Sequence, residues 1–313
     1  MRILVTGGAG YIGSLLCPLL LDAGHEVILL DRLIFGVQPI LHFVTHPKLA
    51  VVHGDIRDPR VVAPVAKRAD AVLHLAAIVG SPACAADPTT AETTNVDGTR
   101  TLVDALSASQ MLVYASTGSV YGRCETVATE ETPVAPLTLY GRTKRDAERL
   151  VVEKGGVGLR FATAFGLSPR LRLDLLVNDL CYQACHNKHV ILFQGQHRRT
   201  FLHARDAAAV YPFTLDRYPA MRGQVYNVGA SDLHYTKIDV ARAIAALQPF
   251  YLHEAEVGED PDQRNYEVSY AKINALGYRA TTTLDEGIRE MLRVCPLIEQ
   301  RSPWRNAVGA SHA

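Results

Sequence analysis

Two side chains that can exchange a proton with a substrate stand four residues apart, at Tyr140 and Lys144. The surrounding pattern predicts a helix from about residue 140 to 154, and residues four apart share one face of a helix. A tyrosine has an ordinary pKa of about 10, and a neighbouring ammonium favours the phenolate, so the phenol can act as base or acid near neutral pH. Thr117, at the end of an apolar run, adds a hydroxyl that can share a substrate oxygen. Alone, the Tyr140/Lys144 pair is also a common contact on helix surfaces, so its meaning depends on the rest of the chain.

A glycine-rich turn near the start of the chain supplies that context. The apolar run Arg2-Ile3-Leu4-Val5-Thr6 stops at Gly7, and Gly7-x-x-Gly10-x-x-Gly13 overlaps the dinucleotide fingerprint Gly8-x-Gly10-x-x-Gly13 before a helical pattern begins. Such glycines allow a sharp turn, a close approach of backbone N–H groups to a diphosphate, and tight packing of helix on strand. An ordinary glycine-rich turn is the alternative. With a nicotinamide at the strand ends, Tyr140 and Thr117 would form a hydride-transfer site.

An acidic residue ends the next predicted strand, Glu26–Leu30. Asp31 lies about 20 residues beyond the glycine motif, where a carboxylate holds the adenosine ribose hydroxyls. Because a carboxylate repels a 2′-phosphate, Asp31 favours NAD over NADP, while the neighbouring Arg32 argues the other way.

Strands alternate with helices over the first half of the chain, and this alternation predicts an α/β fold with a doubly wound parallel sheet and right-handed crossovers. Beyond Gly166 the rhythm loosens, which predicts a smaller, interleaved C-terminal α+β domain. We expect a dinucleotide-binding Rossmann domain over residues 1–165 plus about 200–230. The substrate domain would take about 166–199 plus 231–301, and residues 302–313 would form a flexible tail.

The order of these motifs along the chain resembles the extended short-chain dehydrogenase/reductases, and specifically their nucleotide-sugar epimerase/dehydratase family. The resemblance runs from Arg2 to about Met291 and also includes Asn95-Val96-Asp97-Gly98-Thr99 and Ser116-Thr117-Gly118-Ser119-Val120-Tyr121-Gly122. It implies that Asp31 holds the adenosine ribose and that Thr117 and Tyr140 act on the substrate, while Lys144 also binds the nicotinamide ribose. The full set implied to bind NAD is Gly7, Gly10, Tyr11, Ile12, Gly13, Asp31, Arg32, Asp55, Ile56, Leu75, Ala76, Ala77, Asn95, Ala115, Tyr140 and Lys144.

The same resemblance implies a nucleotide-diphosphate sugar as substrate. Arg199 matches an arginine that grips the substrate diphosphate, a role suited to a planar guanidinium. Asn178 and Arg264 are further candidates, whose alternatives are a helix surface and a solvated loop. The full set implied to bind substrate is Ser81, Thr117, Ser119, Tyr140, Thr163, Asn178, Arg199 and Arg264.

Departures from the family pattern favour some reactions of the family over others. Where 4,6-dehydratases carry an Asp-Glu pair after the threonine, this chain has Gly118-Ser119, which argues against a dehydratase. Thr163 stands where many members have an asparagine that contacts the diphosphate. We therefore expect an epimerase that oxidises a sugar carbinol, at C4, and returns the hydride to the other face. A net C4 dehydrogenase or 4-ketoreductase uses the same residues, and a non-catalytic dinucleotide-binding regulator is a third possibility.

The composition of the chain limits the kinds of partner that it is expected to bind. The 313 residues carry 32 basic and 32 acidic side chains, and the pI is about 7.2, so neither a nucleic-acid footprint nor a polybasic membrane surface is expected. The start of the chain shows no signal peptide, and six dispersed cysteines fit a cytoplasmic protein with reduced thiols. The spacing Cys181-x-x-x-Cys185-His186-x-x-His189 does not match a zinc site, so no metal is expected.

A homodimer is also expected from the resemblance, because the helices near residues 92–107 and 140–154 usually pair with their copies in a second subunit. Leu102, Leu106, Ala147 and Leu150 could form that seam. The alternative is that these side chains only face their own sheet.

Overall fold

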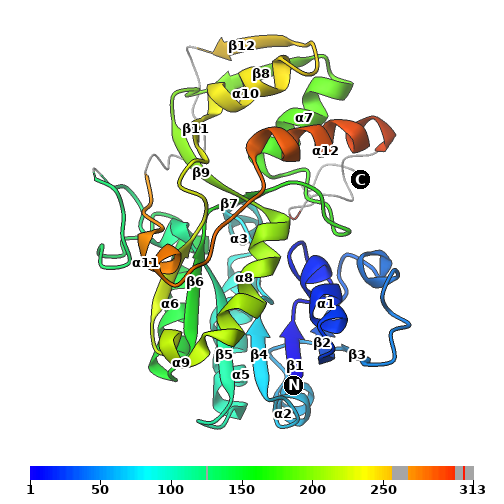
Figure 1. The fold of residues 1–313 in the computed structure, drawn as a ribbon, viewed down its shortest axis with the longest axis vertical. Coiled ribbons are helices and arrows are strands. Elements are labelled where there is room, and N and C mark those ends of the chain that lie inside the picture. Colours follow the sequence, from blue (N-terminus) through cyan, green and yellow to red (C-terminus); the bar gives the residue numbers. More distant parts are fainter. Residues whose placement is uncertain (125, 256–266, 300–305, 307–313) are drawn as a thin grey trace.

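A seven-stranded sheet in which all neighbouring strands run parallel forms the centre of the larger part of the molecule (Figure 1). The computed structural model describes residues 1–124, 126–255, 267–299 and 306. The strand order is β10-β6-β5-β4-β1-β2-β3, which confirms the predicted doubly wound fold. The strands are β1 (Arg2–Thr6), β2 (Glu26–Asp31), β3 (Leu49–His53), β4 (Ala71–His74), β5 (Met111–Thr117), β6 (Val157–Phe161) and β10 (Val225–Val228). The order reverses between β1 and β4, and such sheets bind ligands beyond the carboxyl ends of the strands at this point.

Helices cover both faces of this sheet, which explains why its central strands are continuous apolar runs. In β1, Ile3 and Val5 face one hydrophobic core and Leu4 faces the other, and all three are fully buried. The first core is closed by α1 (Gly13–Asp22) and α8 (Ala204–Asp216), and the second by α2 (Pro59–Ala66), α5 (Gly98–Ala105) and α6 (Leu139–Glu153). The other helical segments around this sheet are η1 (Gln38–Ile40), α3 (Ser81–Ala86), α4 (Pro88–Glu92), the π-helical turn η2 (Thr93–Asp97), η3 (Gly118–Val120), α9 (Tyr218–Met221) and α11 (Ala271–Ala275).

A third core lies beyond the carboxyl ends of the large sheet, at the top of Figure 1, between two small sheets and three helices. It is formed by buried residues between Phe165 and Ile298. Its elements are β7 (Thr163–Phe165), α7 (Leu176–His186), β8 (His189–Phe193), β9 (Arg198–His203), β11 (His234–Thr236), α10 (Lys237–Ala245), β12 (Tyr251–Ala255), α12 (Leu284–Val294) and η4 (Cys295–Leu297). The exact domain boundaries stay a prediction, and the expected tail lies outside the described residues except for Asn306.

Some elements differ from the sequence prediction. Pro82 and Pro88 in the sequence predict a long loop after Leu75, but this stretch contains α3. The single helix predicted near residues 92–107 is α4, a π-helical turn and α5 in succession. Helix α8 has no counterpart in the prediction. None of the described helices is both long and apolar enough to cross a membrane.

The residues considered for a dimer seam mostly face inward. Leu102, Leu106 and Ala147 belong to the core between α5, α6 and the sheet, and each is at most 5% exposed. Among the side chains considered for a seam, Leu150 alone is partly exposed. The alternative given above therefore holds for these three residues, and the homodimer itself stays a prediction.

Candidate active site

A cavity of about 300 Å³ opens beyond the carboxyl ends of the central strands. The glycine turn, the end of β2, the end of β4, the end of β5 and the start of α6 all contribute to its wall. Most of the side chains selected from the sequence meet there. The predicted residues that line it are Gly7, Gly10, Tyr11, Ile12, Gly13, Asp31, Arg32, Ile56, Leu75, Ala76, Ala77, Ala115, Thr117, Ser119, Tyr140, Lys144 and Thr163.

The glycine turn is packed too closely for side chains. Gly7 has φ +74°, and a Cβ there would lie 2.7 Å from the backbone nitrogen of Ala76. A Cβ at Gly13 would lie 2.3 Å from the carbonyl oxygen of Gly7. No described side chain caps the start of α1. The N-terminus of α1 therefore presents backbone N–H groups to the cavity, an arrangement that suits a diphosphate.

Asp31, predicted to hold the adenosine ribose, lines the cavity at the end of β2. Its Oδ2 accepts a hydrogen bond from the Ala9 N–H at 3.0 Å and its Oδ1 accepts one from the Leu33 N–H at 2.8 Å. Burial raises the pKa of Asp31, and these backbone donors partly oppose the shift. Arg32 turns instead toward Asp55, with 3.4 Å between its Nε and Oδ2 of that carboxylate. The ribose contact of Asp31 stays a prediction, while Arg32, which argued for NADP, pairs with Asp55.

Asp55 does not line the cavity, although its neighbour Ile56 does. The Asp55 carboxylate is bound by the Arg57 guanidinium, with Nη2 2.6 Å from Oδ2 and Nε 3.0 Å from Oδ1. The hydrogen bond from Arg57 is the largest cause of a lowered pKa at Asp55. The role of Asp55 in binding NAD stays a prediction.

The residues predicted to transfer a proton lie where β5 ends and α6 begins. The Thr138 hydroxyl caps α6 by accepting a hydrogen bond from Gly141 N–H at 3.1 Å, which fixes the first turn that carries Tyr140. Lys144 is only 2% exposed, and its Nζ lies 4.2 Å from the centre of the Tyr114 ring. Burial lowers the pKa of Lys144 to about 7, opposed in part by Cys84 and Glu148. Thr117 and Tyr140 line the same cavity as this ammonium.

Asn95 supports the site from behind and does not line the cavity. It lies in the π-helical turn and is 1% exposed. Its Oδ1 accepts a hydrogen bond from the Ile78 N–H at 2.7 Å, and its Nδ2 donates to the Ile78 carbonyl and to Thr143 Oγ1, both at 3.0 Å. Because Thr143 follows Tyr140 by three residues, Asn95 ties the loop after β4 to the helix that carries the phenol.

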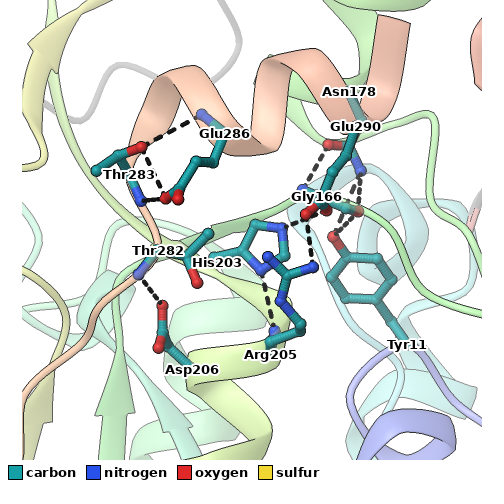
Figure 2. Close-up of polar contacts among 10 residues, drawn as sticks. All are labelled: Tyr11, Gly166, Asn178, His203, Arg205, Asp206, Thr282, Thr283, Glu286 and Glu290. Carbon is teal, nitrogen blue, oxygen red and sulfur yellow. Dashed lines mark hydrogen bonds and ion pairs between the residues drawn. The ribbon is translucent and has the colours of Figure 1, made fainter. Parts of the chain in front are cut away.

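Several predicted substrate residues lie away from the cavity wall. Asn178 is fully buried: its Oδ1 accepts a hydrogen bond from the Gly166 N–H at 2.8 Å, and its Nδ2 donates to the Arg172 carbonyl at 2.9 Å (Figure 2 shows the contacts to Gly166). Arg199 is 4% exposed and donates to the Arg198 carbonyl at 2.9 Å. These three residues, Asn178, Arg199 and Ser81, do not line the cavity. Arg264 lies outside the described residues.

Further residues line the cavity that the sequence analysis does not select. They include Phe35, Arg170 and Asn306, and Val79 and Arg172 line the cavity as well. The two arginines have a signal in the sequence, since Pro169-Arg170-Leu171-Arg172 places two guanidinium groups in an otherwise apolar stretch. Among the described lining residues, Asp31 is the only carboxylate, whereas Arg32, Lys144, Arg170 and Arg172 are cationic. The wall therefore favours a ligand with several negative charges.

Comparison with known proteins agrees with this geometry. Residues 3–229 match the model of the "NAD dependent epimerase/dehydratase family". The Bacillus subtilis protein named "Uncharacterized UDP-glucose epimerase YtcB" is 29% identical, over 92% of this chain and 96% of the relative. The UDP-glucuronic acid decarboxylase 1 of Xenopus tropicalis is 27% identical, over 93% of this chain and 71% of the relative. The crystal structure of the Thermus thermophilus UDP-glucose 4-epimerase in complex with NAD superposes with a TM-score of 0.81. It is 26% identical and covers 94% of this chain and 99% of that chain.

Proposed function

Because the chain belongs to the NAD dependent epimerase/dehydratase family, we propose that it is a nucleotide-sugar 4-epimerase. The cofactor is NAD, in line with the family and with the acidic residue Asp31 in the cavity wall at the end of β2. Relatives named for UDP-glucose and UDP-glucuronic acid support a nucleotide-diphosphate sugar as the substrate. The cationic wall of the cavity is complementary to such a ligand.

In this proposal Tyr140 removes the proton from the C4 hydroxyl of the sugar, and the Thr117 hydroxyl shares the same oxygen. The buried Lys144 ammonium lowers the cost of the phenolate and binds the nicotinamide ribose. When bound, NAD supplies the hydride acceptor. The flat 4-keto sugar then turns over in the cavity, and Tyr140 returns the proton to the oxygen once the opposite face has been reduced. No net oxidation results.

The observation that carries this proposal is the absence of a second acid at the substrate end of the described cavity wall. Elimination of water from a sugar needs a group that removes a proton from carbon and another that protonates the leaving hydroxyl. Beside Thr117 the wall offers Ser119, whose Oγ lies 3.2 Å from Thr117 Oγ1. The only carboxylate among the described lining residues is Asp31, at the end of β2. The site thus supports removal and return of a hydride better than dehydration.

A net C4 dehydrogenase or 4-ketoreductase is the second candidate, since it uses the same Thr117, Tyr140 and Lys144. The test is to incubate the protein with a panel of UDP-, dTDP-, GDP- and CDP-sugars and to follow both NADH absorbance and product stereochemistry by NMR. An epimer formed without change in NADH supports the proposal. A stoichiometric change in NADH, release of carbon dioxide, or loss of water from the sugar overturns it.

Tyr140→Phe tests whether the site is catalytic at all. We expect turnover to fall by about 10²- to 10⁴-fold, the usual contribution of a positioned acid or base. Tyr251→Phe, at a side chain that is 68% exposed on β12, is the matched control and should retain full activity. Equal turnover in both variants would revive the alternative of a dinucleotide-binding regulator.

A further inference from the structure

His74 ends β4, is fully buried, and has a hydroxyl group beside each of its ring nitrogens. Its Nδ1 lies 2.8 Å from Oγ1 of Thr6, at the end of β1, and its Nε2 lies 2.8 Å from Oγ1 of Thr99, on α5. The proton transfer proposed above does not use this side chain. Because a hydroxyl can donate or accept, the other contacts of the two threonines decide where the imidazole proton lies.

The Thr99 hydroxyl places the imidazole proton on Nε2. Thr99 Oγ1 donates its only proton to the Asn95 carbonyl at 2.6 Å, so it can only accept from His74. Burial lowers the pKa of His74 to about 3, with a smaller contribution from the Lys144 ammonium, so the ring carries a single proton near neutral pH. Nδ1 is then an acceptor, and the Thr6 hydroxyl donates to it.

The hydrogen bonds of the imidazole continue in both directions, to the cavity wall and to the helix that carries the phenol. At one end, Thr6 Oγ1 accepts from the N–H of Ala76 at 3.3 Å, and Ala76 lines the cavity. At the other end, Asn95 Nδ2 donates to Thr143 Oγ1 at 3.0 Å, and this hydroxyl donates to the Tyr140 carbonyl at 3.0 Å. A buried row of hydrogen bonds thus joins the wall after β4 to the first turn of α6.

The surroundings of His74 favour the singly protonated ring. The centres of the His74 and Tyr114 rings are 5.3 Å apart, and Lys144 Nζ lies 4.2 Å from the centre of the same tyrosine ring. A second proton on His74 would therefore place two cations beside one buried ring. It would also remove the acceptor of the Thr6 hydroxyl, and the row of hydrogen bonds would lose its single direction.

We propose that His74, with its proton on Nε2, is a positioning residue that holds the π-helical turn η2 against α6 and so sets the place of the Tyr140 hydroxyl in the cavity. The proposal rests on the proposed function, because it needs a proton transfer at Tyr140. A misplacement of about 1 Å can cost a reaction about 10²-fold in rate. Loss of the imidazole contacts should therefore lower kcat and leave KM unchanged, because substrate binding is not altered.

Thr99→Val tests the row by removing the hydroxyl between His74 and Asn95. On a nucleotide sugar that the wild type converts, we expect kcat to fall about 10- to 100-fold with unchanged KM and unchanged bound NAD. The matched control is Thr214→Val on α8. Thr214 is also fully buried and donates to a carbonyl four residues earlier, that of Val210, at 2.7 Å, but it does not line the cavity. Equal kcat in the two variants overturns the proposal.

Two substitutions of His74 itself separate the two ring nitrogens. The amide of His74→Gln can reach Thr99 as a donor, as Nε2 does, whereas the shorter His74→Asn can only accept from Thr6. We expect His74→Gln to keep most of the wild-type kcat and His74→Asn to lose as much as Thr99→Val. Equal loss of kcat in both overturns the role of the Nε2 proton, and this pair decides the matter if Thr99→Val does not fold.

Nitrogen NMR of protein labelled with ¹⁵N-histidine tests the proton position without any substrate. The His74 signals are identified by their through-space contacts to the Tyr114 ring. We expect a neutral ring protonated at Nε2 across the neutral pH range. A ring that titrates there, or one protonated at Nδ1, overturns the proposal even if every variant fails to fold. If the wild type converts no sugar, the proposed function fails, while the nitrogen spectrum still decides the direction of the hydrogen bonds.

Discussion

Breaking the buried ion pair between α6 and β6 should destabilise the protein far more than breaking an exposed pair on the same helix. Glu148 and Arg160 have side chains that are 6% and 7% exposed, with 2.7 Å between Arg160 Nη2 and Glu148 Oε1 and 3.0 Å between Nε and Oε2. Arg160 Nη1 also donates to Tyr121 Oη at 2.9 Å, and that hydroxyl donates to Asn227 Oδ1 at 2.6 Å. In Arg160→Met the Glu148 carboxylate stays buried without its cation. We expect a loss of about 3–5 kcal/mol in the free energy of unfolding.

The matched control is Arg149→Met. Arg149 Nε lies 3.7 Å from Glu153 Oε1, and these side chains are 70% and 65% exposed, so the expected loss is at most about 0.5 kcal/mol. Urea unfolding followed by circular dichroism measures both; at a slope of about 3 kcal/mol/M, the Arg160→Met midpoint falls by about 1 to 2 M. The double variant Glu148→Leu/Arg160→Met should recover most of the loss, because no charge remains buried. The reasoning is refuted if Arg160→Met is no less stable than Arg149→Met. It is also refuted if the double variant loses as much free energy of unfolding as Glu148→Leu and Arg160→Met lose together.

Three other predictions concern the cavity. Gly13→Ala should fold but purify without NAD, because the added Cβ would meet the Gly7 carbonyl oxygen. The ratio of nucleotide absorbance to protein absorbance in the purified protein measures the bound NAD. Between pH 7 and 10 the wild type should gain stability relative to Lys144→Met, by up to about 1.4 kcal/mol per pH unit. The folded state sheds the Lys144 proton near pH 7 while the unfolded chain still binds it, so stability rises with pH in urea titrations. Asn178→Ala should cost about 1–3 kcal/mol in unfolding free energy, because the buried Gly166 N–H loses its acceptor.

Each of these has its own control. Gly24→Ala introduces the strain of a positive φ, +84°, which Gly13 does not have, but no atom lies closer than 3.9 Å to the added Cβ, and this variant should retain NAD. For Lys144, the prediction is contradicted if the free energies of unfolding of wild type and Lys144→Met change in parallel between pH 7 and 10. For Asn178→Ala, the control is Asn187→Ala, at an exposed residue at the end of the same helix, which should keep the wild-type stability. A raised KM of Asn178→Ala with unchanged stability would favour the substrate role expected from the family.

The larger sheet could be predicted because its strands are buried on both faces and therefore appear as unbroken apolar runs. Burial is also the reason why the sequence did not predict α8. That helix packs against both α1 and the sheet, and Ala204, Ala207, Ala208 and Val210 are fully buried, so no polar stripe marks its period. Helix α3 is short and starts with Ser81-Pro82, which the sequence analysis took as a loop signal. Local sequence patterns thus identified the elements with one clear periodicity. They missed a helix that is buried on most of its sides and a helix that is too short to show a period.

The candidate site divides in the same way. The glycines, Asp31, Thr117, Tyr140 and Lys144 each lie in one strand-turn-helix unit, so their order along the chain and the family resemblance predicted that they meet in one cavity. The roles of other side chains depend on distant partners that no local pattern contains. Asn178 carries an amide that could contact a substrate, yet it binds the backbone around Gly166. Arg170 shows no motif, and only the fold brings it to Phe35.

The path of the chain between its cores has a consequence for biosynthesis. After β6 the polypeptide enters the third core at Phe165, returns to the large sheet with α8 and β10, and adds Val268, Tyr270 and Tyr278 to the first core before α12 completes the third. Neither side can therefore finish folding while the last quarter of the protein is still inside the ribosome. Until β10 emerges, the edge of β6 lies open to pairing with other nascent chains. A fragment cut near residue 165 inherits that open edge, so this enzyme cannot be divided at the apparent waist into two separately folding pieces.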